Sequence, residues 1–311
     1  MTAALALSWT EALPTLRGRI QHDAPLAPFT WFRVGGPGEM LVRPADAADL
    51  SHFLAGLAPE IPVTVIGAAS NLIIRDGGIP GIVVKLARGF SGIAVEEGGI
   101  VAGAAALDAT IAERAAAAGL AGLEFLSGIP GSLGGAVAMN AGAYGAEMAE
   151  VLDWAELVLR SGEIVRLAAH ELGLSYRHAN IPPGAVVVRA RLRARPGETQ
   201  LIAARMHEIK ASREATQPVR ARTGGSTFRN PEGYKAWTLI DQAGCRGMVL
   251  GGAQVSEKHC NFLINTGSAT AAELESLGDA VRRRVRAQSG IDLQWEIRRI
   301  GIPGAAPEAS P

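Results

Sequence analysis

Cysteine is scarce in this sequence, and an excess of either charge is missing. The 311 residues include two cysteines, Cys245 and Cys260, which form no C-x-x-C pair, so a disulfide framework and a metal site have no support and buried free thiols are expected. Lys plus Arg equals Asp plus Glu at 30 each, so no overall field would hold nucleic acid or an anionic membrane. Any affinity for anions must therefore be local.

Long apolar runs are also missing. No stretch approaches the ~18 uncharged apolar residues that span a bilayer, and the first residues carry Glu11 and no basic leader. We therefore expect no membrane partner and a cytoplasmic location. With 48% hydrophobic residues in 311, the chain can bury more than one core and should divide into two or three domains.

Glycine, in contrast, is abundant and gathers in two stretches. The larger runs from Leu123 to Gly145 (LEFLSGIPGSLGGAVAMNAGAYG), and the smaller runs from Gly67 to Gly81 (GAASNLIIRDGGIPG). Glycine lets the main chain approach a ligand closely and lets successive N–H groups converge on an anion. Either stretch alone could be a set of tight turns, but two together indicate a site for a diphosphate.

Neither stretch matches a usual nucleotide-binding motif. The sequence has no G-x-x-x-x-G-K-[ST], and no G-x-G-x-x-G joins a strand to a helix with an acidic residue about 20 positions later. A dinucleotide would therefore be bound by a different fold.

Hydrophobic periodicity predicts a mixture of helices and strands. Helices are expected after the capping residues Asp46, Asp108 and Thr270, the last with Glu273 at N3 and Gly290 as the stop, and after Thr199. Strands are expected at 63–66, 82–86, 93–95, 100–102, 154–160, 163–167, 186–195 and 293–300. The alternating row Arg189, Arg191, Arg193 and Arg195 is expected on a solvated sheet face. A domain boundary is expected near residue 198, and the tail after Gly301 should be disordered.

Three places combine a reactive side chain with a loop or a strand end. Arg177, in Ser175–His178, could clamp a carboxylate through two parallel hydrogen bonds, although most arginines are surface residues. Ser226 follows two glycines and could present its hydroxyl, although a turn-capping serine is more common. Glu296 lies among apolar neighbours and could face a polar pocket or water.

A set of motifs along the chain carries a family resemblance. They are FTWFRVGGP, IGAASNLIIRDGGIPG, LSGIPGSLGGAVAMNAGAYG, LSYRHA, GGSTFRNP, AGCRGMVLGGAQVSEKHCNFLINTG and WEIRRIG, and they recur in order from Phe29 to Gly301. Together they resemble the UDP-N-acetylenolpyruvoylglucosamine reductase (MurB) family of peptidoglycan precursor synthesis. The motifs of the last third separate this family from other flavoenzymes with the same FAD-binding fold.

The resemblance implies an α+β fold with a two-subdomain FAD-binding region of the PCMH, or vanillyl-alcohol-oxidase-like, type and a C-terminal α+β substrate-binding domain. Its implied limits are 20–88 and 89–197 for the two FAD-binding subdomains, 198–301 for the substrate-binding domain and 302–311 for a disordered tail. The short run between Ala179 and Arg195 resembles the compact branch of the family, which lacks an inserted substrate-covering loop. We expect a monomer.

The resemblance also implies roles for individual residues. The catalytic residues would be Arg177, Ser226 and Glu296, and the substrate contacts would be Tyr144, Asn230 and Lys258. The FAD contacts would be Gly67, Ser70, Asn71, Gly128, Gly131, Ser132, Gly134, Gly135 and Asn140. Ala69 departs from the family pattern, which usually has glycine at this position.

The implied activity is the NADPH-dependent reduction of the enolpyruvyl ether of UDP-N-acetylglucosamine to UDP-N-acetylmuramate, through non-covalently bound FAD. Such an enzyme serves cell-wall biogenesis, cell shape and cell division. Two alternatives stay open at this point. One is an FAD oxidase that acts on alcohols or sugars, and the other is a flavin- or nucleotide-sugar-binding protein without catalysis, which the presence of Arg177, Ser226 and Glu296 disfavours.

Overall fold

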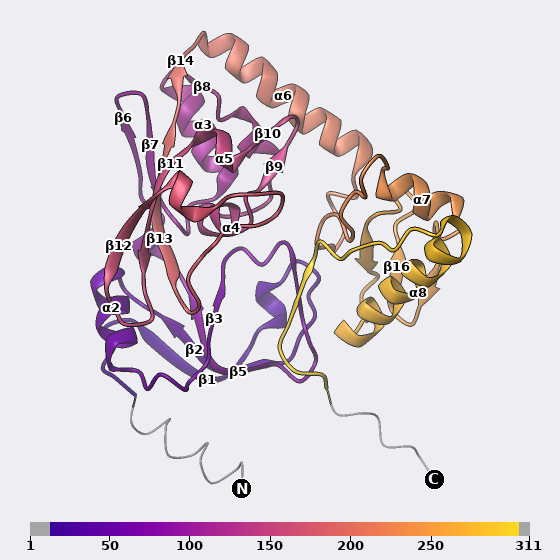
Figure 1. Cartoon of the computed structure of the whole chain (residues 1–311), viewed down its shortest axis with the longest axis horizontal. Coiled ribbons are helices and arrows are strands. Elements are labelled where there is room, and N and C mark those ends of the chain that lie inside the picture. Colours follow the sequence, from indigo (N-terminus) through magenta and orange to yellow (C-terminus); the bar gives the residue numbers. More distant parts are fainter. Residues whose placement is uncertain (1–12, 305–311) are drawn as a thin grey trace, which may run out of the picture. The chain divides into compact units, whose positions relative to one another are not determined.

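The computed structural model describes residues 13–304. Within them the chain forms two compact units (Figure 1). Unit 1 is made of residues 13–22, 40–67 and 81–209, and unit 2 is made of residues 23–39, 68–80 and 210–304. Each unit is therefore assembled from separate segments of the chain, with strands near the N-terminus contributing to both.

Helices and strands are mixed along the whole described chain. The helices are α2 (Ala47–Gly56), α3 (Asp108–Ala117), α4 (Leu133–Ala138), α5 (Met148–Val151), α6 (Thr199–Thr216), α7 (Ala236–Gln242) and α8 (Ala271–Ser289), with the short 3-10 helices η1 (Ala27–Phe29), η2 (Arg88–Phe90), η3 (Glu124–Gly128) and η4 (Ala169–Leu172). The strands are β1 (Arg19–Pro25), β2 (Pro37–Arg43), β3 (Val63–Ile66), β4 (Leu72–Ile74), β5 (Ile79–Lys85), β6 (Ile93–Glu96), β7 (Gly99–Gly103), β8 (Leu120–Ala121), β9 (Gly142–Ala143), β10 (Ala146–Glu147), β11 (Leu152–Val158), β12 (Ile164–Ala168), β13 (Val186–Arg193), β14 (Arg195–Pro196), β15 (Val249–Leu250), β16 (Ala253–Val255), β17 (Leu263–Asn265) and β18 (Arg298–Ile300).

A five-stranded antiparallel sheet in the order β12-β11-β13-β7-β6 forms the centre of unit 1. One face of this sheet packs with α3 and α4 into an apolar core. On the other face, Arg189 Nε lies 2.7 Å from Glu156 Oε1, and Arg191 Nη1 lies 2.6 Å from Asp153 Oδ2. Arg189, Arg191 and Arg193 are thus exposed or half-buried and paired with acidic residues of β11, as predicted for a solvated face. Arg195 is also exposed, but it lies on β14, which pairs with β8.

A second sheet, β1-β2-β5-β3, carries α2. The predicted cap is confirmed, because Asp46 Oδ1 accepts a hydrogen bond from Asp49 N (2.9 Å). Asp49 does not complete a capping box. Its buried carboxylate accepts instead from the N–H groups of Arg17, Gly18 and Ala45 at 2.7, 3.0 and 2.8 Å. These donors outweigh the effect of burial and lower the pKa of Asp49.

Unit 2 is built around α8, which lies against β16 in Figure 1. At its N-terminus, Thr270 Oγ1 accepts from Glu273 N (3.1 Å), and the Glu273 carboxylate accepts from Thr270 N (3.0 Å). The helix ends at Gly290 in the left-handed conformation. The predicted capping box and stop are therefore confirmed. Both cysteines, Cys245 and Cys260, are buried free thiols, as expected, and burial raises the pKa of each.

The strand predicted at 293–300 is shorter in the structure. β18 begins at Arg298 and pairs in parallel with β4. The residues before it are held by individual contacts: Arg282 Nε donates to Leu293 O at 2.7 Å, and Glu296 N donates to Thr227 O at 2.8 Å. Trp295 forms a single bridge with Phe228. The apolar pattern therefore located an extended segment, but only its end forms a sheet.

The residue predicted to cap α3 does not do so. The N-cap is Leu107, and Asp108 is the first helical residue. Its N–H donates to Gly131 O (3.2 Å), and its side chain is 0% exposed, with neither carboxylate oxygen hydrogen-bonded to any described residue. Packing of the glycine stretch on this end of the helix has thus buried a residue that usually caps from the surface.

The predicted domain limits near residues 88, 197 and 301 stay a prediction, because they divide the chain by role whereas the compact units divide it by packing. Residues 23–39 and 68–80, which the prediction placed in the first FAD-binding subdomain, pack in unit 2. Of the predicted tail, Ile302 N donates to Gly78 O (2.9 Å), and residues 305–311 lie outside the described part of the chain.

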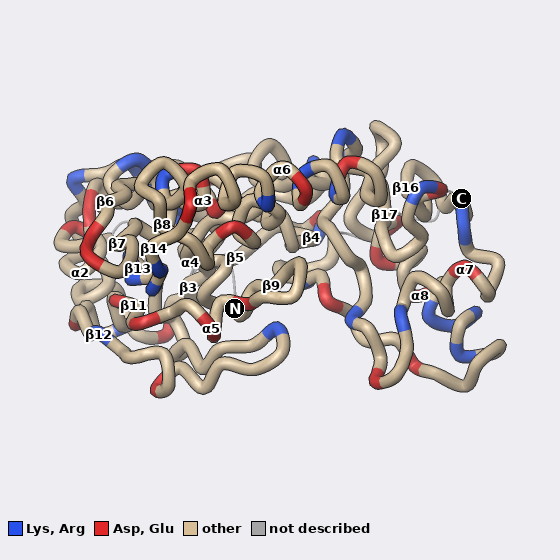
Figure 2. Tube along the Cα trace, turned by 90° about the horizontal axis from the view of Figure 1, so that it is seen from above, with Lys and Arg blue, Asp and Glu red and all other residues tan. Residues whose placement is uncertain are grey.

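Charged residues of both signs are interspersed along the trace (Figure 2), in keeping with the equal totals in the sequence. Among residues 13–304, no helix combines the length and the apolar character needed to cross a bilayer.

Ala69 has a φ of 51°, in the left-handed region, and this explains why glycine would suit the position. Left-handed backbone costs about 1–2 kcal/mol for alanine, and glycine costs about 0.5–1 kcal/mol in extra unfolded-chain entropy. We therefore expect Ala69→Gly to raise the free energy of unfolding by up to about 1 kcal/mol in denaturant titrations. Ala68, which has no positive φ, is the matched control. Ala68→Gly should lower stability, and equal effects of the two changes would refute the strain argument.

Candidate functional site

The larger glycine stretch includes α4, and its glycines differ in how much space an added Cβ would have. A Cβ at Gly131 would lie 2.6 Å from Asp108 Oδ2, and a Cβ at Gly134 would lie 2.9 Å from the Cβ of Ala104, so both positions need glycine for packing. A Cβ at Gly135 would have nothing within 4 Å. Gly135 is therefore a point in this stretch where a ligand can reach the main chain without displacing protein.

The two glycine stretches meet within unit 1. A Cβ at Gly67 would lie 2.7 Å from Ser132 Oγ, and Ser132 is buried directly before α4. Lys85 Nζ donates to Gly67 O at 2.8 Å, and burial lowers the pKa of Lys85. The start of the smaller stretch thus lies against the larger one and beside a cationic side chain. The following residues, including Ser70 and Asn71, belong to unit 2.

Arg177 is presented by a tight turn in unit 1. Ser175 and His178 exchange two backbone hydrogen bonds of 3.0 Å each, and Arg177 has a φ of 56° between them. Its Nη2 donates to Gly142 O at 3.2 Å, and its guanidinium carbon lies 4.9 Å from the centre of the Tyr176 ring. The turn therefore holds the guanidinium against the end of the large glycine stretch.

Asn140 connects this turn to the glycine stretch. It is 0% exposed, its Nδ2 donates to Ser175 O (3.0 Å), and its Oδ1 accepts from Ala149 N (2.8 Å). The amide thus fixes the distance between the loop and the arginine turn. Its predicted contact with FAD stays a prediction.

Tyr144 lies at the end of the same stretch. A Cβ at Gly128 would be 2.5 Å from the Tyr144 ring, which explains the glycine. Tyr144 also lines an open cavity of about 460 Å³ with Arg193 and Arg205, so its ring is in an accessible place, as a substrate contact requires.

Ser226 lies in an extended segment of unit 2 that is held by its neighbours. It forms a backbone bridge with Phe262, while Asn261 bonds to both the N–H and the C=O of Phe228 through its side chain at 3.0 and 2.8 Å. Thr227 N donates to Asn261 O at 2.7 Å. No described residue hydrogen-bonds the Ser226 hydroxyl, so the turn-capping alternative has no support here.

Glu296 lies on the neighbouring segment and is half-buried. Its N–H donates to Thr227 O at 2.8 Å, directly beyond Ser226, so the backbone joins these two predicted catalytic positions in unit 2. Asn71 binds the same segment, because Asn71 Nδ2 donates to Glu296 O (3.2 Å) and Arg298 N donates to Asn71 O (3.0 Å). A predicted FAD contact and two predicted catalytic residues are thus brought together.

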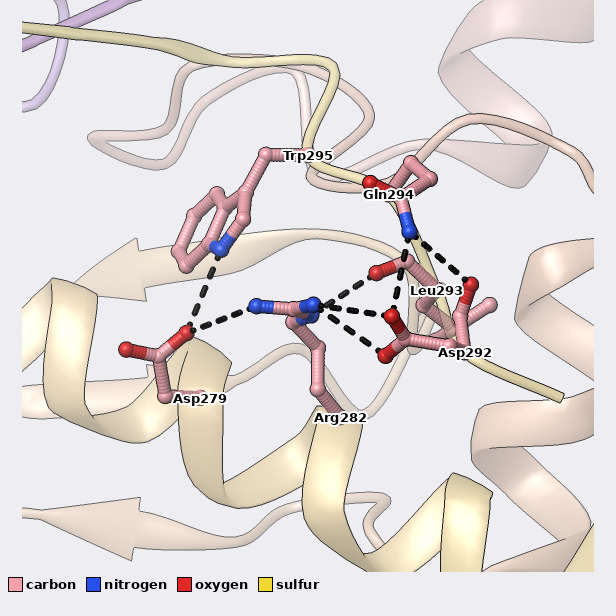
Figure 3. Close-up of polar contacts among 6 residues, drawn as sticks. All are labelled: Asp279, Arg282, Asp292, Leu293, Gln294 and Trp295. Carbon is pink, nitrogen blue, oxygen red and sulfur yellow. Dashed lines mark hydrogen bonds and ion pairs between the residues drawn. The ribbon is translucent and has the colours of Figure 1, made fainter. Parts of the chain in front are cut away.

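The residue before Glu296 is anchored on α8 (Figure 3). Trp295 Nε1 donates to Asp279 Oδ1 (3.3 Å), the same oxygen lies 3.5 Å from Arg282 Nη1, and the Trp295 ring centre lies 5.1 Å from that of Phe228. The Trp295 side chain is therefore fixed on α8 directly before Glu296.

Two residues predicted to bind substrate, Asn230 and Lys258, form hydrogen bonds within unit 2. Asn230 Oδ1 accepts from Ala236 N at the start of α7 (3.0 Å), and Lys258 Nζ donates to Glu214 O (2.5 Å). Both residues are thus held in place, and their contacts with substrate stay predictions. The catalytic trio is divided between the units, with Arg177 in unit 1 and the other two residues in unit 2.

Sequence reasoning missed Asn261 and Asp108. Asn261 lies inside a quoted motif and is 4% exposed, and the signal available was an amide among apolar neighbours in HCNFLIN. It supports the segment that carries Ser226. Asp108 was predicted to cap α3, and no local signal marked it as buried.

Comparison with known proteins agrees with this division of roles. Residues 38–168 match the family described as FAD binding domain, and residues 217–300 match the C-terminal domain of UDP-N-acetylenolpyruvoylglucosamine reductase. The reductase of that name from Acidiphilium cryptum is 71% identical over 98% of this chain and 100% of its own length. The one from Granulibacter bethesdensis is 66% identical over 96% of each chain.

Among solved structures, the crystal structure of UDP-N-acetylenolpyruvylglucosamine reductase (MurB) from Thermus caldophilus has a TM-score of 0.79 and 35% sequence identity, and the match covers 92% of this chain and 99% of that one. The predicted fold class, an FAD-binding region followed by a C-terminal domain, is confirmed. The chain belongs to the UDP-N-acetylenolpyruvoylglucosamine reductase (MurB) family.

Proposed function

We propose that this chain catalyses the NADPH-dependent reduction of the enolpyruvyl ether of UDP-N-acetylglucosamine to UDP-N-acetylmuramate with FAD, in peptidoglycan precursor synthesis. The single observation that carries the proposal is the hydrogen bond from Asn71 to the main chain of Glu296. It joins a residue of a glycine stretch to a segment that is itself bonded to Thr227, the residue after Ser226. A cytoplasmic location belongs to the same proposal, since the reductant and the nucleotide sugar are cytoplasmic metabolites.

The glycine stretches fit FAD. The open space at Gly135 leaves main chain accessible on a loop without acidic side chains between Ile129 and Gly135. The other glycine stretch meets this loop where Gly67 lies against Ser132. Gly67, Gly128, Gly131, Ser132, Gly134 and Gly135 would hold the diphosphate, and Ser70, Asn71 and Asn140 are proposed as further contacts with FAD. FAD, when bound, supplies the chemistry that carries a hydride from NADPH to the substrate.

The side chains proposed as catalytic serve the remaining needs of the reaction. Hydride adds to the CH2 carbon of the enolpyruvyl group, so negative charge develops on the adjoining carbon and its carboxylate. Arg177 remains protonated and can bind this carboxylate as a planar fork, and Glu296 is proposed to act on the same group. Ser226, whose hydroxyl has no partner among the described residues, would deliver the proton to the carbon that bears the ether oxygen. Tyr144, Asn230 and Lys258 would hold the substrate.

The test is anaerobic absorbance of the purified protein. The flavin bands should bleach with NADPH and return when the enolpyruvyl substrate is added without oxygen. Bleaching by an alcohol, followed by recovery in air alone, would favour an oxidase. A colourless protein that takes up no FAD would refute the proposal.

Gly135→Ala tests the place proposed for FAD. The methyl group meets no protein atom within 4 Å, so folding should be unchanged, but the group would face the bound cofactor. We expect FAD affinity to fall about tenfold or more, since close main-chain approach is lost. Binding is measured by quenching of flavin fluorescence.

Gly92→Ala is the matched control, because a Cβ at Gly92 also has nothing within 4 Å and its φ is not positive. It should bind FAD like the native protein. Native affinity in Gly135→Ala would place the diphosphate elsewhere.

A further inference from the structure

Asp108 is a carboxylic acid enclosed beneath the large glycine stretch. Its N–H donates to Gly131 O, the adjacent Leu107 forms a backbone bridge with Ser132, and Leu133 N donates to Ala106 O at 3.0 Å. The loop is thus fastened to residues 106–108 by backbone contacts. The carboxyl group faces the loop, because a Cβ at Gly131 would lie 2.6 Å from Asp108 Oδ2.

No described group compensates a charge at this place. The side chain is 0% exposed, and neither oxygen has a hydrogen-bond partner among residues 13–304. Burial alone raises the pKa of Asp108 to about 8. The loop from Ile129 to Gly135 has no titratable residue, and neither does the adjacent segment from Gly99 to Leu107.

Charged residues on the elements that pack around α3 do not alter the pKa of Asp108. They are Glu113 and Arg114 on α3 itself, Glu124 on η3 and Glu96 on β6, and none of them contributes to the shift. An unpaired carboxylate in such surroundings is strongly unfavourable, whereas the neutral acid is tolerated. Asp108 therefore carries its proton at neutral pH.

We propose that Asp108 is a positioning residue for FAD: its carboxyl group supports the loop at Gly131 only while it is protonated, and loss of that proton weakens FAD binding. The inference rests on the proposed place of the diphosphate on this loop. An ionised carboxylate behind Gly131 would repel the diphosphate and draw water under the loop. By reciprocity, bound FAD would favour the protonated form by the same factor.

The sign of the pH dependence follows from the neutral form being the competent one. Affinity for FAD should be constant below about pH 8 and fall above it, by about tenfold per pH unit at most. Because the folded protein holds this proton more tightly than the unfolded chain does, the stability contribution is full below the unfolded pKa and is lost as pH rises towards 8.

The experiment follows FAD released from the diluted holoenzyme by fluorescence, from about pH 6.5 to about pH 9.5. Asp108→Asn keeps the shape and removes the titration, and Asp108→Leu removes the polar group. Both variants should retain FAD at the alkaline end, where the native protein releases it. Ionisation of free flavin affects all proteins alike and cancels in this comparison.

Thermal unfolding supplies a readout without the cofactor. Asp108→Asn should unfold at a higher temperature than the native protein near pH 8 and at the same temperature near pH 4. Asp49→Asn is the matched control, because Asp49 is also buried but is bound by three N–H donors. It should lose stability at neutral pH and keep the native pH dependence of FAD release.

The inference is wrong if the native protein retains FAD equally across this range, or if Asp108→Asn and Asp108→Leu release it as the native protein does. Failure of the diphosphate site itself would be seen separately, as native FAD affinity in Gly135→Ala.

Discussion

Ser226→Ala should leave reduction of the flavin by NADPH near its native rate and slow reoxidation by the enolpyruvyl substrate on the order of a thousandfold or more. The segment is held by Asn261 and by the bridge to Phe262, and not by the serine hydroxyl, so the loop should form without it. Only the second half-reaction needs a proton at the substrate carbon. Rapid-mixing absorbance measures the two half-reactions separately.

Two further variants make this test specific. Ser226→Cys should recover part of the rate, because a thiol is a better acid than a hydroxyl. Ser161→Ala is the control for a serine that does cap a turn, since Ser161 Oγ accepts from Glu163 N at 3.3 Å. It should cost about 1 kcal/mol of stability and show no preference for either half-reaction. Equal slowing of both half-reactions in Ser226→Ala would remove Ser226 from the mechanism.

Arg177→Lys should reduce substrate turnover on the order of a hundredfold or more while NADPH still reduces the flavin. The charge remains, but lysine cannot bind a carboxylate as a planar fork or keep the same bond to Gly142 O. Since arginine and lysine both have a Cβ, the positive φ at position 177 strains the native protein and the variant alike. Steady-state turnover and single-turnover flavin reduction check the result.

Arg189→Lys is the matched change on the sheet face, where the guanidinium pairs with Glu156 at an exposed site. Such pairs contribute about 0–1 kcal/mol, so turnover should not change. Native turnover in Arg177→Lys would show that Arg177 has a surface role and that the proposed trio is wrong.

The parts of the fold that could be predicted are those that depend on neighbours in sequence. The capping box of Thr270 and Glu273 and the stop at Gly290 need only a few adjacent residues, and the structure confirms them. Asp108 had an equally good local pattern for a helix cap. That prediction was wrong because the loop at Gly131, which is distant in sequence, encloses the residue. Propensity identifies a residue that can cap a helix, and tertiary packing decides whether it does.

The residues proposed for the site were found by resemblance to the family. The contacts that support them could not be predicted from the sequence. Asn140 is fixed by Ser175 and Ala149, and Glu296 is fixed through Thr227 and Asn71, so both depend on partners distant in sequence. Nothing in the alternation of residues 293–297 reveals that Trp295 would be bound by Asp279. Such pairings are determined by the fold as a whole.

The parallel pairing of β18 with β4 has a consequence for synthesis on the ribosome. Arg298–Ile300 pair with Leu72–Ile74, so this pair closes a loop of more than two hundred residues. Non-local pairings form late because the entropy of closing the loop must be overcome first. The segment that carries Glu296 leaves the ribosome after the glycine stretches and after Ser226. A nascent chain can therefore begin folding unit 1, but it cannot place Glu296 beside Asn71 until the last strand of the described chain has been made.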